Sequence, residues 1–113
     1  VWGHEDVELS LKLWLFGYSL YTVPTVKILH HFRDKHPYPV KLDHVHYNLL
    51  RMAYSHFNEE RIGKVLDLIG PGRRSKIING RVLKSGAMEQ RRRYFARRKY
   101  DDDWFMKKFG IAF

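Results

Sequence analysis

The sequence predicts an α/β fold, as a fragment that is mainly helical and contains one short pair of β-strands. Three observations support this prediction. Apolar residues recur at three- and four-residue spacing in several segments, as on the buried face of a helix. One segment near the N-terminus is instead rich in β-branched and aromatic residues, which is typical of strands. Glycine and proline lie between these segments, where elements are expected to end.

The first predicted helix begins near residue 5. Glu5, Asp6 and Glu8 crowd its first turn, where the positive end of the helix dipole favours negative charge. Gly17 is expected to end it, because glycine readily adopts the left-handed conformation of a helix terminus. Between these limits the apolar side chains form one stripe, which consists of Val7, Leu11, Trp14 and Leu15.

Two short strands are predicted next, at residues 18–23 and 26–32, with Pro24 between them. Residues 34–42 contain Pro37 and Pro39 and show no period, so we expect a loop that could act as a lid.

The second half of the chain is predicted to be helical. Asp43 is a candidate N-cap for a helix with the apolar stripe Val45, Leu49, Met52, Ala53 and Phe57. A further stripe, formed by Ile62, Val65, Leu66 and Ile69, predicts a helix that ends at residues 70–72. We expect a basic connector at residues 73–80, an exposed helix over 82–99, and a last short helix capped by the aspartates at 101–103.

The length of 113 residues suits one small domain, and the composition is apolar enough for a core. The chain has no cysteine, which fits a reducing compartment, so we expect a cytoplasmic protein, with contact to a membrane surface as a further option. No apolar stretch is long enough to span a bilayer, and no leader precedes it. Val1 falls inside a motif, so we expect this chain to be a fragment.

Charge is divided unevenly. Residues 1–60 have a net charge of −1, whereas residues 61–113 have a net charge of +10. A dense basic surface is expected at Arg91, Arg92, Arg93, Arg97, Arg98 and Lys99. Such a run is usually a solvated helix face, but it could meet an anionic membrane. Nucleic acid is a less favoured partner, because the run matches no nucleic-acid motif.

Several short motifs in the first sixty residues match a known pattern in both residue type and spacing. They are Trp2-Gly3, Glu5-Asp6, Gly17-Tyr18, Val23-Pro24, His30-His31-Phe32-Arg33 and His36-Pro37-Tyr38. This pattern resembles the catalytic domain of family 2-like glycosyltransferases, in particular the polypeptide N-acetylgalactosaminyltransferases and their bacterial relatives. The similarity continues weakly to Glu59 and covers about half the chain. His4 and Thr25 depart from the pattern, where the family usually has glycine and cysteine.

The resemblance implies an incomplete GT-A nucleotide-diphospho-sugar transferase fold. Residues 1–60 would be the C-terminal part of the catalytic domain, and residues 61–113 a basic helical extension. The nucleotide-binding half and its acidic metal motif are absent, so the chain alone is expected to be inactive. The intact enzyme would move a sugar from a UDP-sugar to a hydroxyl of a protein, glycan or lipid, using Mn²⁺.

His30 is the candidate metal ligand, since imidazole suits manganese and the resemblance places a ligand there. The remaining ligands would lie in the absent half. Without the motif, His30 would be read as an ordinary histidine at a strand end.

Four residues are candidates for donor binding. Arg33 could fork two hydrogen bonds to a phosphate, although a surface ion pair is an equal alternative. His36 and Tyr38 resemble positions that order over bound nucleotide, or are plain loop residues. Trp2 could stack on a sugar or pack in the core.

Glu5 and Asp6 are the catalytic candidates. In an inverting enzyme Asp6 resembles the general base, whereas in a retaining polypeptide-type enzyme Glu5 lies near the sugar. Both could also only stabilise the helix start. The matches favour a retaining transferase. An inverting family 2 enzyme and a non-catalytic basic binding module remain as alternatives.

Overall fold

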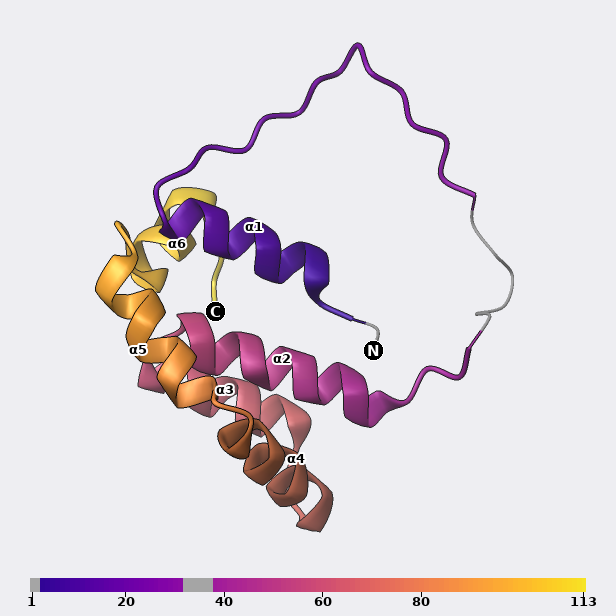
Figure 1. Cartoon of the computed structure of the whole chain (residues 1–113), viewed down its shortest axis with the longest axis vertical. Helices are drawn as coiled ribbons and strands as arrows, with labels where there is room; N and C mark the ends of the chain where they lie inside the picture. Colours follow the sequence, from indigo (N-terminus) through magenta and orange to yellow (C-terminus); the bar gives the residue numbers. More distant parts are fainter. Residues whose placement is uncertain (1–2, 32–37) are drawn as a thin grey trace.

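The computed structural model describes residues 3–31 and 38–113. The regular elements of this part are α1 (Glu5–Leu15), α2 (Leu42–His56), α3 (Glu59–Ile69), α4 (Arg73–Lys84), α5 (Ala87–Arg97) and α6 (Asp102–Phe109). Helix α2 packs against α1, α3, α4 and α5, while α6 packs against α1. The helices form a bundle, from which residues 18–31 extend away after α1 (Figure 1).

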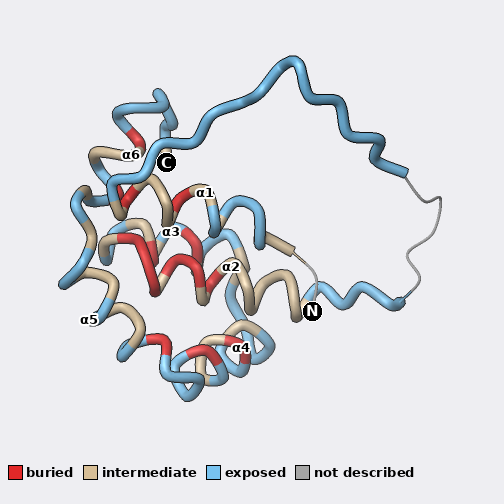
Figure 2. The backbone as a smooth tube through the Cα atoms, turned by 45° about the horizontal axis from the view of Figure 1, so that its top comes forward, coloured by how far each residue is buried: buried red, intermediate tan, exposed pale blue. Residues whose placement is uncertain are grey.

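The core is centred on α2, as the buried stretches in Figure 2 show. It takes apolar residues from every helix, namely Leu11, Leu15, Leu50, Met52, Ala53, Phe57, Ile62, Val65, Ile78, Val82, Ala87 and Met106. Residues on both sides of position 60 thus share one hydrophobic core, although the charge of the chain changes there.

The predicted α/β class is wrong for the described residues, because the structure there has helices and no strand. The β-rich stretch is exposed, with Ile28 and Leu29 at 87% and 96% of full exposure. The backbone turns around Pro24, where the Val26 N–H donates to the Val23 carbonyl at 3.1 Å. A strand is stable only when a neighbouring strand pairs its backbone, and here none lies beside it. The short β pair and the GT-A assignment are therefore corrected to an all-α arrangement.

Three helix boundaries also differ from the prediction. Asp43 is not the N-cap of α2, because the helix begins at Leu42 and its N-cap is Lys41. Residues 73–80 are not a connector but belong to α4, because Ile78 and Val82 are one turn apart and both buried. The helix expected over 82–99 is broken at Gly86, whose φ of 77° is left-handed. The predicted ends at Gly17 and Gly70 and the cap by Asp101, whose carboxylate accepts from the Trp104 N–H, are confirmed.

A buried carboxylate joins α3, α5 and α6. Asp102 is 1% exposed, and its Oδ2 accepts hydrogen bonds from the Asn58 backbone N–H and from Arg61, both at 2.8 Å. Its Oδ1 lies 3.7 Å from Arg98. Asn58 in turn caps α3 by accepting from the Arg61 N–H at 3.0 Å. The arginines and the hydrogen bonds at this junction therefore compensate for the burial of the Asp102 charge.

Two arginines of the basic run close the C-terminal end of α2. Arg91 donates to the carbonyls of Tyr54 and Phe57 at 2.9 and 2.5 Å, and Arg98 donates to that of His56 at 3.0 Å. The ring of Phe95 lies under both guanidinium groups, at 4.0 and 3.6 Å. These cations satisfy carbonyls that a helix end leaves without partners, and they meet the negative end of its dipole.

No helix in the part of the chain that the structure describes is long and apolar enough to cross a bilayer.

Replacing Asp102 by alanine should lower the free energy of unfolding by about 3 kcal/mol, because Arg61 and Arg98 would keep their charge without the buried carboxylate. Urea unfolding followed by circular dichroism measures the loss. Asp103→Ala is the matched control. It removes a neighbouring carboxylate that also pairs with Arg61 but is 68% exposed, and should cost about 1 kcal/mol or less. Equal losses in the two variants would contradict the role given to Asp102.

Candidate functional site

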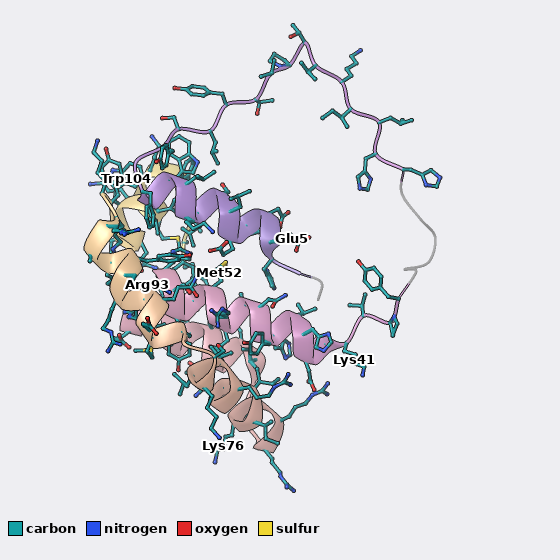
Figure 3. The ribbon with its side chains drawn as sticks, in the orientation of Figure 1. Glu5, Lys41, Met52, Lys76, Arg93 and Trp104 are labelled. Carbon is teal, nitrogen blue, oxygen red and sulfur yellow. The ribbon has the colours of Figure 1, made fainter. Side chains whose placement is uncertain are left out.

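A polar cleft of about 300 Å³ lies between the N-terminal half of α1, the middle of α2 and the start of α5. Glu5 and Met52, labelled in Figure 3, belong to two of the helices that border it. Its walls are formed by Gly3, His4, Glu5, Glu8, Lys12, Asn48, Arg51, Met52, Ser55 and Gln90. Carboxylates, cations and amides thus face one small space, which suits a polar ligand with several hydroxyl groups.

Glu8 lines this cleft and contacts His56, which does not line it. Glu8 and Lys12 are one turn apart on α1, so their side chains meet, with Nζ to Oε2 at 3.1 Å. His56, the last residue of α2, is 1% exposed and its Nε2 lies 2.9 Å from Glu8 Oε1. The hydrogen bond from His56 lowers the pKa of the Glu8 carboxyl, partial burial opposes the shift, and Lys12 lowers the pKa further.

A second chain of contacts runs from α2 to α5. Arg51 donates to Gln90 Oε1 at 2.7 Å and to the Ser85 carbonyl at 3.1 Å. Gln90 donates to the Tyr94 hydroxyl at 2.8 Å, and the Tyr94 ring stacks on His56 with centroids 5.2 Å apart. The two series of side-chain contacts therefore meet at His56. Helix α5, which follows residue 60, holds part of the cleft wall.

The residues before α1 hold Glu5 at the mouth of the cleft. Gly3 and His4 both have positive φ, 114° and 65°, which turns the chain into the helix. The Gly3 carbonyl accepts from the Asn48 side chain at 3.0 Å, and the Gly3 N–H donates to Glu5 at 3.2 Å. Glu5 is exposed, so its carboxylate is available to a ligand.

Asp6 does not line the polar cleft. Its carboxylate accepts from the Val7 N–H at 2.8 Å and borders an apolar groove of about 650 Å³ between α1, α2, α3 and α6. Glu5 therefore lines the polar cleft and Asp6 the apolar groove, although both also border a smaller hollow beside Val45.

The other candidates are not gathered at the cleft. His30 and Tyr38 are exposed in the loop between α1 and α2 and line none of the pockets described above. Trp2, Arg33 and His36 lie outside the described residues. Within residues 3–31 and 38–113, no three histidine or acidic side chains are placed to hold a metal ion.

The basic run divides into two sets. Arg91 and Arg98 point inward to α2, with exposed side-chain fractions of 11% and 16%. The exposed members are Arg92, Arg93, Arg97 and Lys99.

Sequence reasoning did not single out Glu8, Lys12, His56 or Gln90 as site residues. The spacing of Glu8 and Lys12 was a usable signal for a pair on one helix face. Nothing local indicates that His56 or Gln90 would meet them, because those contacts join residues 48 and 39 positions apart.

The Glu8 carboxylate should stabilise the fold at neutral pH. Its folded pKa lies below the ordinary value of 4.5, so the stabilisation is complete above that value and is lost as pH falls through the lowered pKa. Glu8→Gln should therefore cost about 1 kcal/mol at pH 7, and the difference from the parent should vanish in acid.

Thermal unfolding of both proteins across the acidic range measures this difference. Glu60→Gln is the control, because Glu60 has the same pairing with a lysine one turn away, Lys64, but is exposed and has no histidine partner. A penalty for Glu8→Gln that does not change with pH would contradict the assignment.

Known proteins match about half of this chain. Probable N-acetylgalactosaminyltransferase 8 of Caenorhabditis elegans is 39% identical over 61 residues, which is 52% of this chain and 14% of that protein. Polypeptide N-acetylgalactosaminyltransferase 11 of Xenopus tropicalis is 38% identical over 61 residues, 52% of this chain and 10% of that protein. Human polypeptide N-acetylgalactosaminyltransferase 14 is 47% identical over 38 residues, 34% of this chain and 7% of that protein.

No protein-family model matches the chain, and no solved structure matches it. The matched segments span 14% or less of the length of these three relatives. The chain is thus related in sequence, over about half of its length, to glycosyltransferases named for N-acetylgalactosamine transfer.

Proposed function

We propose that this chain contributes one wall of the active site of a glycosyltransferase, which moves a sugar from a UDP-sugar to an acceptor hydroxyl with retention of configuration. The observation that carries the proposal is the identity of 38 to 47% to N-acetylgalactosaminyltransferases. Several of these relatives are named for polypeptide acceptors, so a hydroxyl on a protein is the acceptor we favour.

The polar cleft beside Glu5 supports this proposal. A hexose carries several hydroxyl groups, each of which can donate and accept a hydrogen bond. Glu5 can accept from sugar hydroxyls, Asn48 can accept and donate, and Arg51 can donate. Their role is to bind and orient the sugar, so that its anomeric carbon faces the acceptor.

The positions of Glu5 and Asp6 favour the retaining alternative over the inverting one. A general base must be within hydrogen-bond reach of the acceptor hydroxyl. Asp6 borders the apolar groove and accepts from its own helix, whereas Glu5 borders the cleft that can hold a sugar. Glu5 is therefore the carboxylate that we assign to the reaction.

His30 is the one residue of this chain that we consider as a ligand for manganese. A metal ion needs several ligands, and the described residues place no cluster around this histidine. The described residues therefore do not assemble a metal site, and we derive no step through the metal.

The 113-residue chain alone is expected to transfer no sugar from UDP-N-acetylgalactosamine to a serine- and threonine-containing peptide. We assign this chain the binding and orientation of the sugar, and the resemblance implies that the sites for the diphosphate and the metal are completed by the other half of the catalytic domain. Mass spectrometry of the peptide after incubation with Mn²⁺ measures this. Turnover by the isolated chain would overturn the one-wall proposal.

In the gene product that carries this chain, Glu5→Gln should lower the rate of sugar transfer about a hundredfold, because it keeps the size of the side chain but removes a charge at the sugar. Asp6→Asn should have a much smaller effect. The anomeric configuration of the product, read by NMR, gives an independent answer. A β-linked product from a UDP-α-sugar, with the larger loss at Asp6→Asn, would establish the inverting alternative instead.

A further inference from the structure

The outer face of α4 is basic. One stripe of α4 has steps of three or four residues and contains Arg73, Lys76, Ile77, Gly80 and Lys84. The opposite face carries the buried residues Ile78 and Val82, which belong to the core around α2. Packing thus turns this row of cations to solvent.

The outer face of α5 is also basic. Arg92, Arg93 and Arg97 are exposed, while Arg91 and Arg98 on the inner side donate to carbonyls of α2. Helices α4 and α5 follow one another and both pack on α2. Figure 3 labels Lys76 on α4 and Arg93 on α5. We call the exposed set, Arg73, Lys76, Lys84, Arg92, Arg93 and Arg97, the α4–α5 basic face.

The charge of this face is not neutralised within the described part of the chain. The arginines and lysines after residue 60 that pair with carboxylates are not members of this set, and are Arg61, Lys64, Arg74, Arg91 and Arg98. Among the described residues, no member of the α4–α5 basic face forms an ion pair, although Glu89 in the first turn of α5 is acidic. A concentrated positive potential therefore remains at this surface.

Apolar side chains lie among these cations. Ile77 is 52% exposed, Leu83 42% and Met88 43%, all on α4 or at the start of α5. Cations mixed with exposed aliphatic side chains are typical of helices that rest on a lipid interface, where the aliphatic groups enter the headgroup region.

The same surface lacks the aromatic groups that bind single-stranded nucleic acid by stacking. Tyr94 stacks on His56, and Phe95 is covered by two guanidinium groups. Both rings are therefore engaged inside the bundle.

We propose that the α4–α5 basic face binds the anionic surface of a lipid membrane, with Ile77 and Leu83 entering the headgroup region. This binding is separate from sugar transfer and does not rest on it. Acidic lipids supply the opposite charge, and the apolar side chains supply a contribution that salt does not screen.

The 113-residue chain is mixed with phosphatidylcholine vesicles with and without phosphatidylserine, and binding is measured by sedimentation. The chain should bind only the vesicles with phosphatidylserine. The triple variant Lys76→Gln, Arg92→Gln, Arg93→Gln should bind about 100-fold more weakly at low salt, from roughly fivefold per cation. The control variant Lys27→Gln, Lys64→Gln, Lys107→Gln has the same net charge and should keep most of the binding.

A second variant tests the apolar contribution. Ile77→Ser with Leu83→Ser should lower the binding that survives at high salt, and circular dichroism verifies that each variant is folded. Equal losses in the triple and control variants would overturn the proposal, because net charge alone would explain binding. Tight binding to a polyuridine RNA, with no binding to the vesicles, would also overturn it and assign the face to nucleic acid.

Discussion

The bundle depends on the arginines at the C-terminal end of α2, which bind the last carbonyls of that helix and pair with a buried carboxylate. The carbonyls at that end accept hydrogen bonds from Arg91 of α5 and from Arg98, which directly follows α5. Arg98 also faces the buried Asp102, which holds Arg61 and the start of α3. A carboxylate with so little exposure is stable only when it is paired and hydrogen-bonded. Four helices are therefore fixed to one another by a few polar contacts that would be costly to leave unmade.

The candidate site depends on this junction. His56 is the last residue of α2, so the contacts that fix its carbonyl also fix the ring that pairs with Glu8. Arg51 and Gln90 hold the other side of the cleft, and Gln90 lies on the helix that carries Arg91. The extension beyond residue 60 is thus part of the wall around the proposed sugar site. Its outer surface, which serves neither the core nor the cleft, carries the charge that we assign to a membrane.

Much of the helical structure could be predicted from local signals. The acidic first turn of α1, the glycines at 17 and 70 and the cap by Asp101 act within a few residues, and each was placed correctly. The prediction failed for residues 18–31, whose β-branched side chains favour a strand only when a second strand pairs with them. It also failed at α4, because the density of basic residues obscured the spacing of Ile78 and Val82.

The sequence by itself determined most of the helices, the uneven charge and the relation to glycosyltransferases. Only the tertiary structure decided which cations of the basic run are exposed to solvent. Arg91 and Arg92 are adjacent and chemically identical, yet one donates to α2 and the other faces solvent. It also brought Glu8 and Gln90 to one cleft and His56 against Glu8, while leaving His30 in a loop apart from the cleft. The reason is that local propensity acts over one or two turns, whereas these outcomes depend on contacts between residues more than thirty positions apart.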